Sequence, residues 1–436
     1  MKIMTAYSVK IKHYNHIFKE TVAVYRQAVD FLIKVCNEQW DILSELNAYS
    51  QLRAMEMLIH KTKCNPNPIY DNFDTLFYKF PNYLRRSAIN KAIGLVSSYR
   101  SNLANWEAKQ EGKAPTLPKA GYIYPVLYRV DTYKRTDTYT AQIKVYVRNT
   151  WDWIVVNLRK TDVDYITNHC YNRKECSPTL QKRGKEWFLD FPFEEKVALC
   201  DVDIHEQTIV AVDLGINCAA TVTAMKADGT ILGRHFCHLI EETDRLEHSI
   251  NRIKKAQQHA NFKTPRLWAK ADGLNHDISV KTAAFIIETA TFYNANAIVF
   301  EHLDKKGKAK GSKKQKLKLW RSQEVQSIVE NKAHRLGMRI SHVNAYKTSR
   351  LAYDGSGLVK RSKENYSICT FQTGKIYNCD LSASYNIGAR YFVREILKSL
   401  PAKDRLCIEA KVPQCSKRSA CTFSTLINLN AELLSA

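Results

Sequence analysis

Three carboxylates stand where apolar stretches of the sequence end. Residues 208–212 form a short β-branched run, typical of a buried strand, and Asp213 follows it directly. A second such run, 297–300, ends at Glu301, and Asp380 opens a helical pattern, LSASYNIGARYFVREIL. Mg²⁺ prefers hard oxygen ligands and keeps several of its waters, so two or three carboxylates are enough to hold it. These residue types therefore suit divalent-cation chemistry.

Taken alone, each of these residues has a simpler explanation. Asp213 could equally be a surface residue at a strand end, because aspartate is a poor strand residue and an unpaired buried charge is costly. Three carboxylates at the ends of elements in one α/β region change that balance. Their wide separation in the chain favours convergence through a fold over a local binding loop. Crowded carboxylates repel one another, and bound cations relieve that repulsion.

The order of these elements resembles a known nuclease site. Asp-x-Gly after a strand, Glu after a strand and Asp at the start of a helix resemble the RuvC-type site of the RNase H-like fold. The wider sequence resembles the TnpB family, transposon-encoded relatives of compact type V CRISPR effectors. The resemblance is strong in the C-terminal half and only one of layout in the N-terminal half. Its segments are IVAVDLGINCAATVT, RLEHSINRIKKAQQ, AIVFEHL, WRSQEVQSIVENKAHRLGMRISHVNAYKTSR and NCDLSASYNIGAR.

This resemblance implies an Mg²⁺-dependent RNA-guided DNA endonuclease. Asp213, Glu301 and Asp380 would be the catalytic residues and would hold two Mg²⁺ ions, with Asp213 approaching both from the central strand. The implied partners are a guide RNA and a target DNA beside a short flanking motif, with base pairing supplying sequence specificity. Two alternatives stay open. One is an RNA-guided DNA-binding protein with weak or no cleavage, and the other is an unguided nuclease of the same core fold.

The charge of the chain also favours a polyanionic partner. Lys and Arg total 66 against 43 Asp and Glu, a net charge of +23, although part of this excess could serve solubility alone. Basic side chains near tyrosines suit phosphate contacts and base stacking, while a solvated surface role stays open for each. The candidate nucleic-acid contacts are Arg85, Arg86, Lys91, Arg100, Arg245, Arg252, Lys305, Lys306, Lys313, Lys314, Lys347 and Arg350.

The length and the residue patterns predict a multidomain α+β protein. A chain of 436 residues that is 45% apolar exceeds one typical core. Its patterns show a first strand, helices, a Pro/Gly/Lys-rich linker, strands and then an α/β region. The resemblance implies the domains themselves. They are a small wedge β-barrel (1–15 and 115–200), a helical recognition domain (16–114), an RNase H-like (RuvC) α/β nuclease domain (201–345 and 379–436) and a lid insertion (346–378).

Local signals predict further elements in the C-terminal half. An Asp-Gly pair at 228–229 predicts a tight hairpin turn, and helices are expected over about 241–260, 276–294 and 320–337. The stretch 304–314 is too charged and Gly-rich to pack, so we expect a loop that orders on nucleic acid.

The lid insertion departs from the family. TnpB relatives usually carry two Cys-x-x-Cys pairs there, which form a zinc ribbon, and this chain has twelve cysteines but no such pair. A structural site needs four ligands, so we predict no structural zinc. The four positions hold Ala352, Gly355, Cys369 and Gln372. In addition, Ser382 replaces the asparagine of the family's Asp-x-Asn motif.

The sequence predicts no membrane partner. It contains no apolar run of 18 or more residues, and its first residues, MKIMTAYSVKIKHY, lack the apolar core of a signal peptide. We therefore expect a cytoplasmic protein whose cysteines are mostly buried, reduced thiols.

Overall fold

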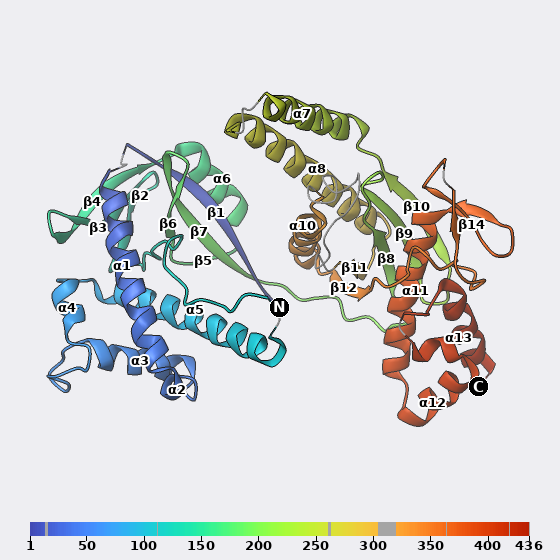
Figure 1. Ribbon diagram of the computed structural model, residues 1–436, viewed down its shortest axis with the longest axis horizontal. Coiled ribbons are helices and arrows are strands. Elements are labelled where there is room, and N and C mark those ends of the chain that lie inside the picture. Colours follow the sequence, from blue (N-terminus) through green and yellow to red (C-terminus); the bar gives the residue numbers. More distant parts are fainter. Residues whose placement is uncertain are drawn as a thin grey trace. The chain divides into compact units, whose positions relative to one another are not determined.

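The protein folds as two compact units. A computed structural model describes residues 1–13, 16–110, 112–259, 263–303, 320–362, 364–417 and 419–435. One unit comprises residues 2–196, and the other comprises Met1 with 197–436 (Figure 1). The prediction of a multidomain protein with mixed helices and strands is confirmed. The finer division into four domains stays a prediction.

The N-terminal unit opens with a strand that leads into helices, as the sequence pattern indicates. The apolar stripe of the first long helix includes Tyr25, Val29 and Leu32. It is buried against the second long helix of this unit, Asn82–Lys109. These elements are β1 (Lys2–Lys12), α1 (His16–Glu38), α2 (Trp40–Leu43), α3 (Ala48–Ile59), α4 (Asn72–Leu76) and α5 (Asn82–Lys109).

The rest of this unit is a sheet of seven strands in the order β2-β3-β4-β1-β7-β5, with β6 also paired to β7. The sequence pattern indicates only strands here, but the structure also contains a helix, α6 (Lys160–Cys170), whose apolar face is buried on the sheet. The strands are β2 (Tyr133–Asp137), β3 (Thr140–Val147), β4 (Thr150–Leu158), β5 (Lys174–Glu175), β6 (Thr179–Arg183) and β7 (Glu186–Lys196).

The C-terminal unit is built on a five-stranded sheet in the order β10-β9-β8-β11-β12. The first three strands in sequence form an antiparallel meander, and β8, β11 and β12 run parallel to one another. Asp228-Gly229 makes the predicted turn of the meander. The strands are β8 (Thr208–Asp213), β9 (Ala220–Lys226), β10 (Ile231–Cys237), β11 (Ala297–His302) and β12 (Arg339–Asn344).

Helices cover both faces of this sheet, and an apolar core fills each side. One helix differs from expectation. The sequence pattern predicts a start near residue 276, whereas α8 begins at Pro265, a residue tolerated in the first turn of a helix. The helices are α7 (Ile240–Gln258), α8 (Pro265–Phe292), α10 (Ser322–Arg335), α11 (Cys379–Ser399), α12 (Ala402–Lys411), η1 (Pro413–Ser416) and α13 (Phe423–Ser435).

A glycine lets α11 approach the sheet closely. A Cβ atom built at Gly388 would lie 2.1 Å from the Sδ atom of Met225 and 3.2 Å from the Cβ of Ala211. Both neighbours are fully buried on β9 and β8. The missing side chain therefore sets the distance between α11 and the central strand, and with it the position of the residues at the helix start.

Gly388→Ala is expected to lower the free energy of unfolding by about 1–3 kcal/mol, because a buried methionine must move to admit the new methyl group. Gly273→Ala is the matched control, since this second helical glycine has open space around its Cβ position. The control should stabilise the protein by about 0.4–1 kcal/mol. Urea unfolding measures both, and equal stability of the two variants would contradict the close approach.

Among the described helices, none combines the length and the apolar character needed to cross a membrane. All twelve cysteines are free thiols, and eight of them are buried. The expectation of mostly buried thiols is therefore confirmed.

Candidate functional site

The register of two parallel strands brings the first two carboxylates to one edge of the sheet. In β8 and β11, Val212 pairs with Phe300, so the residues that follow them, Asp213 and Glu301, come at the same level. Side chains at the same level of neighbouring strands point to the same face. Both carboxylates therefore lie at the carboxyl end of the parallel strands, where open α/β sheets hold their ligands.

The third carboxylate comes from the start of α11. Asn378 caps this helix by accepting a 2.9 Å hydrogen bond from the backbone of Leu381, which places Asp380 in the first helical turn. The positive end of the helix dipole favours a negative charge at this position. Because α11 packs along β8, its first turn lies at the same edge of the sheet as Asp213.

The electrostatics of Asp213 show that the three carboxylates are neighbours. Burial raises the pKa of its carboxyl well above the ordinary value, and the charges of Glu301 and then Asp380 raise it further. The Arg361 guanidinium opposes this effect. Burial likewise raises the pKa of Asp380, again against Arg361. The structure thus gathers all three carboxylates predicted from the sequence, and adds one cation beside them.

Glu301 is held by a hydrogen bond that the sequence pattern does not reveal. Burial raises the pKa of its carboxyl, while the hydroxyl of Thr348, which donates to it, and the charge of Arg390 lower it. Its main-chain carbonyl also accepts from the Nε2 of Gln326 at 3.1 Å. The Thr348 hydroxyl therefore orients the carboxylate, and the Gln326 amide holds the main chain of the same residue.

These residues fit hard divalent cations in donor type and charge. Crowded carboxylates with raised pKa values are stabilised by a cation, and Mg²⁺ prefers carboxylate oxygens. Within the described part of the chain, no three His, Cys, Asp or Glu side chains converge closely enough to hold one ion by themselves. An Mg²⁺ ion bound by these residues would complete its coordination with waters.

The lid insertion is ordered by aromatic side chains. It forms a three-stranded sheet of β13 (Lys360–Arg361), β14 (Ile368–Thr370) and β15 (Ile376–Asn378). The Tyr353 ring lies 5.5 Å from Phe371, 5.0 Å from Tyr377, 5.2 Å from Tyr385 and 6.1 Å from Phe423, centroid to centroid. Two of these rings, Tyr385 and Phe423, come from α11 and α13, so aromatic packing joins the lid to two helices of the C-terminal unit.

Ser382 adds a polar tie to the same place. Its hydroxyl, buried in α11, accepts a 3.2 Å hydrogen bond from the backbone of Tyr353. The serine that replaces the family's asparagine therefore anchors the start of the lid. The prediction of no structural zinc rests on the missing Cys-x-x-Cys pairs and stays a prediction.

Treatment of the purified protein with a zinc-selective chelator is expected to leave its melting temperature unchanged. The reason is that aromatic and apolar contacts, rather than thiolates, form the core of the lid. Differential scanning fluorimetry in magnesium-containing buffer measures this, with untreated protein as the control. A fall of several degrees that added zinc restores would contradict it.

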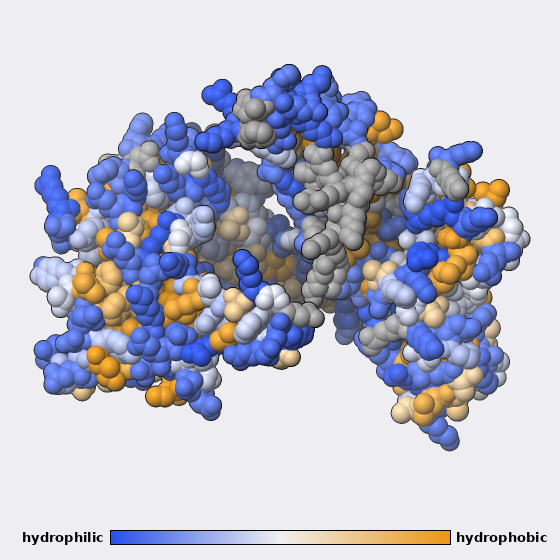
Figure 2. All heavy atoms as spheres, viewed as in Figure 1, coloured by the Kyte–Doolittle hydropathy of each residue, from blue (hydrophilic) through white to orange (hydrophobic). Residues whose placement is uncertain are grey.

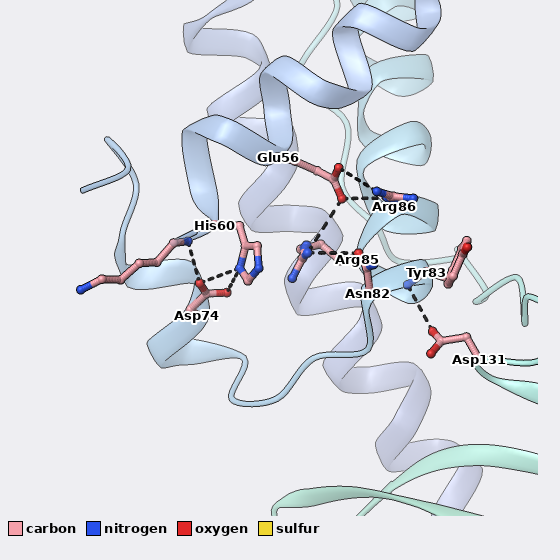
Figure 3. Close-up of polar contacts among 9 residues, drawn as sticks. Glu56, His60, Asp74, Asn82, Tyr83, Arg85, Arg86 and Asp131 are labelled. Atoms are coloured by element: carbon pink, nitrogen blue, oxygen red, sulfur yellow. Dashed lines mark hydrogen bonds and ion pairs between the residues drawn. The ribbon is translucent and has the colours of Figure 1, made fainter. Parts of the chain in front are cut away.

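The basic candidates on α5 divide between interior and surface. Arg85 is 6% exposed, and its guanidinium bonds Asn82 at 3.1 Å and lies 3.8 Å from the carboxylate of Glu56 on α3 (Figure 3). Arg86 contacts the same carboxylate at 2.9 Å. These contacts join α3 to α5, so Arg85 differs from expectation: burial leaves its side chain almost no surface to offer a phosphate.

Two more α5 candidates show the same division. Arg100 is half-buried, and its Nη2 donates a hydrogen bond to the main-chain carbonyl of Asn37 at 2.8 Å. Lys91 is exposed, as Arg86 is in part. Lys91 and Arg86 therefore stay candidate contacts on this helix.

The candidates in the C-terminal unit lie mainly at the surface, in keeping with the largely hydrophilic face that Figure 2 shows. Arg245, paired with Glu241 at 3.3 Å, and Arg252 are exposed on α7. Arg350 is exposed after β12, and Lys347 is half-buried with a left-handed φ of 61°. The remaining candidates, Lys305, Lys306, Lys313 and Lys314, and the loop expected at 304–314 lie outside the described residues.

Comparison with known proteins places the chain in a family. A family model described as Aq_aa04 family matches residues 5–147. The uncharacterized protein aq_aa04 of Aquifex aeolicus (strain VF5) is 31% identical over 130 residues, which are 29% of this chain and 69% of that protein. The chain belongs to the Aq_aa04 family. The match to the family model lies within the N-terminal unit.

A second relative bears on the nuclease resemblance. This Aq_aa04 family member is 24% identical over 235 residues to TnpB-like protein aq_aa05 of the same organism, covering 48% of this chain and 76% of that protein. The resemblance to the TnpB family is thereby confirmed. Among solved structures, that of the mini-RNA-guided endonuclease CRISPR-Cas_phi3 matches 89% of this chain and 92% of its own, with a TM-score of 0.51 and 10% identity. That likeness shows a shared fold.

Proposed function

We propose that this Aq_aa04 family member is an RNA-guided DNA endonuclease with a metal-dependent RuvC-type site. The observation that carries the proposal is the position of Asp213 and Glu301 at one level of neighbouring parallel strands, with the charge of Asp380 also acting on Asp213. The TnpB-like relative and the fold shared with an RNA-guided endonuclease support it. The net charge of +23 suits the nucleic-acid partners, a guide RNA and a target DNA.

We also propose which part of the chain forms each of the expected domains. A meander followed by two parallel strands, with a helix that returns a carboxylate to the sheet, supports an RNase H-like nuclease domain in the C-terminal unit. Helices α1–α5 would form the recognition domain, and the seven-stranded sheet would form the wedge barrel. Base pairing with the guide RNA would select the target, while the protein would recognise a short flanking motif.

In the proposed reaction, a water oxygen forms a bond to the phosphorus of a phosphodiester of the target DNA, the P–O bond to one sugar oxygen breaks, and that oxygen leaves as a hydroxyl after taking a proton. Two bound Mg²⁺ ions would supply activation of the water and the charge that offsets the phosphate. The carboxylates of Asp213, Glu301 and Asp380 would hold these ions. Thr348 keeps the Glu301 carboxylate oriented by donating its hydroxyl hydrogen. The charge of Arg361 lowers the pKa of the Asp213 and Asp380 carboxyls. This guanidinium would face the scissile phosphate and attract it.

One experiment tests the guided part of this proposal. The protein is purified from cells that carry its native flanking DNA, the co-purifying RNA is sequenced, and DNA matched to that RNA is incubated with the complex in Mg²⁺. Cleavage of matched DNA that is lost after ribonuclease treatment is the expected result. Cleavage that survives removal of the RNA would instead favour an unguided nuclease.

A specific observation favours one alternative, an RNA-guided DNA-binding protein with weak or no cleavage. The lid differs from the zinc ribbon of TnpB relatives, and Ser382 anchors it where the family has an asparagine. Tight binding of matched DNA without any product, in Mg²⁺ and in Mn²⁺, would support this alternative.

A further inference from the structure

A buried arginine on α11 forms hydrogen bonds to two segments of the chain next to the candidate site. Arg390 is 4% exposed, and its guanidinium donates to four main-chain carbonyl oxygens. One carbonyl belongs to the last residue of β12, one to the segment that follows this strand, and two to the segment before α13. They are those of Asn344 at 2.5 Å, Tyr346 at 3.0 Å, Ser419 at 3.0 Å and Cys421 at 3.1 Å.

One turn earlier on the same helix, Asn386 also forms hydrogen bonds to both of these parts of the chain. Its side-chain amide, fully buried, donates to the carbonyls of Thr348 at 3.0 Å and Leu351 at 2.9 Å, and its oxygen accepts from the backbone of Phe423 at 3.0 Å. The segment 344–351 is therefore bound along its length by two side chains of α11. A planar guanidinium with five donors suits this task better than the single ammonium of a lysine.

This segment carries the residue that orients a site carboxylate. The hydroxyl of Thr348 donates to Glu301, while its carbonyl is bound by Asn386. The charge of Arg390 also acts on Glu301, whose pKa it lowers. A contact chain thus runs from the guanidinium through the segment 344–348 to the carboxylate, and the same guanidinium acts on that carboxylate through space.

We propose that Arg390 is a positioning residue for the Glu301 carboxylate, acting through the segment that carries Thr348. The inference rests on the proposed function, in which Glu301 is a ligand of a divalent cation. Residues that orient a metal ligand from behind typically change metal affinity about 10- to 100-fold when they are replaced. Arg390 is suited to this role because its guanidinium binds the carbonyls of Asn344 and Tyr346, in the short stretch of chain that leads to Thr348.

The test measures Mn²⁺ affinity of the full-length protein by isothermal titration calorimetry, so it does not depend on DNA cleavage. Arg390→Lys keeps the charge but loses the fork of donors, and should weaken Mn²⁺ binding about 10-fold. Thr348→Val, which removes the hydroxyl, should weaken it similarly, whereas Thr348→Ser should retain it. The double variant Arg390→Lys with Thr348→Val should lose little beyond either single variant, because both changes break one contact chain.

Arg394→Lys is the matched control. This arginine lies one turn further along α11 and also binds the β12 region, through the carbonyl of His342 at 2.9 Å and the hydroxyl of Ser341 at 2.6 Å. Its replacement should change Mn²⁺ affinity less than twofold. Equal losses in Arg390→Lys and Arg394→Lys, or full affinity in Thr348→Val, would overturn the inference alone. Absence of Mn²⁺ binding by the unaltered protein would overturn both the inference and the metal-dependent function.

Discussion

Asp213→Asn is expected to abolish cleavage of matched DNA, lowering the rate by about 10³-fold or more. The substitution keeps the shape of the side chain but removes the charge that lies next to both other carboxylates. Each 1.4 kcal/mol of lost transition-state stabilisation lowers the rate tenfold, so a loss of about 4 kcal/mol suffices. Single-turnover cleavage by the purified complex with its RNA measures the effect.

Binding should survive this change, because Asp213 lies in the proposed cleavage site and not among the candidate phosphate contacts. A gel-shift assay with matched DNA checks it. Asp244→Asn is the control, since it removes an exposed carboxylate from α7 in the same unit. Unaltered cleavage by Asp213→Asn, with a normal rate in the control, would refute the proposed mechanism.

A second large effect concerns the repulsion among the site carboxylates. Without divalent cations, the contribution of these three carboxylates to the free energy of unfolding should fall as the pH rises from about 4 to neutrality. The pKa values of Asp213, Glu301 and Asp380 are all raised in the folded state. The folded protein therefore binds more protons than the unfolded chain between the ordinary and the raised pKa values, and stability is lost as those protons leave.

Divalent cations should reverse this loss at neutral pH. A cation that binds only the folded state at 100 times its Kd adds about 2.7 kcal/mol of stability. Urea unfolding at several pH values, with chelator and with Mg²⁺, measures both effects. Asp213→Asn should show a shallower fall with pH and little response to Mg²⁺. Identical pH dependence in the variant and the unaltered protein would show that the three carboxylates do not interact as described.

The site could be predicted from sequence as far as its signals are local. β8 and β11 are short apolar runs that each end in a carboxylate, and Asn378 before Asp380 is a helix cap. The Asp-Gly turn and the long helix α5 carry similarly local signals. These features depend on residues next to one another in the chain, so the sequence is sufficient to predict them.

Other predictions from the sequence were wrong or incomplete, because tertiary contacts override local sequence patterns. The helix α6 forms within a region of strand-like sequence, since the sheet buries its apolar face. α8 starts eleven residues before its predicted start at 276, with Pro265 as its first residue. Arginine is usually a surface residue, but Arg85 is buried because its charge is paired with the carboxylate of Glu56 on another helix.

By itself, the sequence determined which carboxylates could do the chemistry, which elements carry them and a net charge of +23 that favours a polyanionic partner. Only the tertiary structure decided how these carboxylates meet. The parallel register of β8 with β11, the close approach allowed by Gly388, and the bonds of Asn386 and Arg390 to main-chain carbonyls join residues far apart in the chain. Such contacts arise between backbone groups and packed surfaces, which leave no periodicity or motif in the sequence.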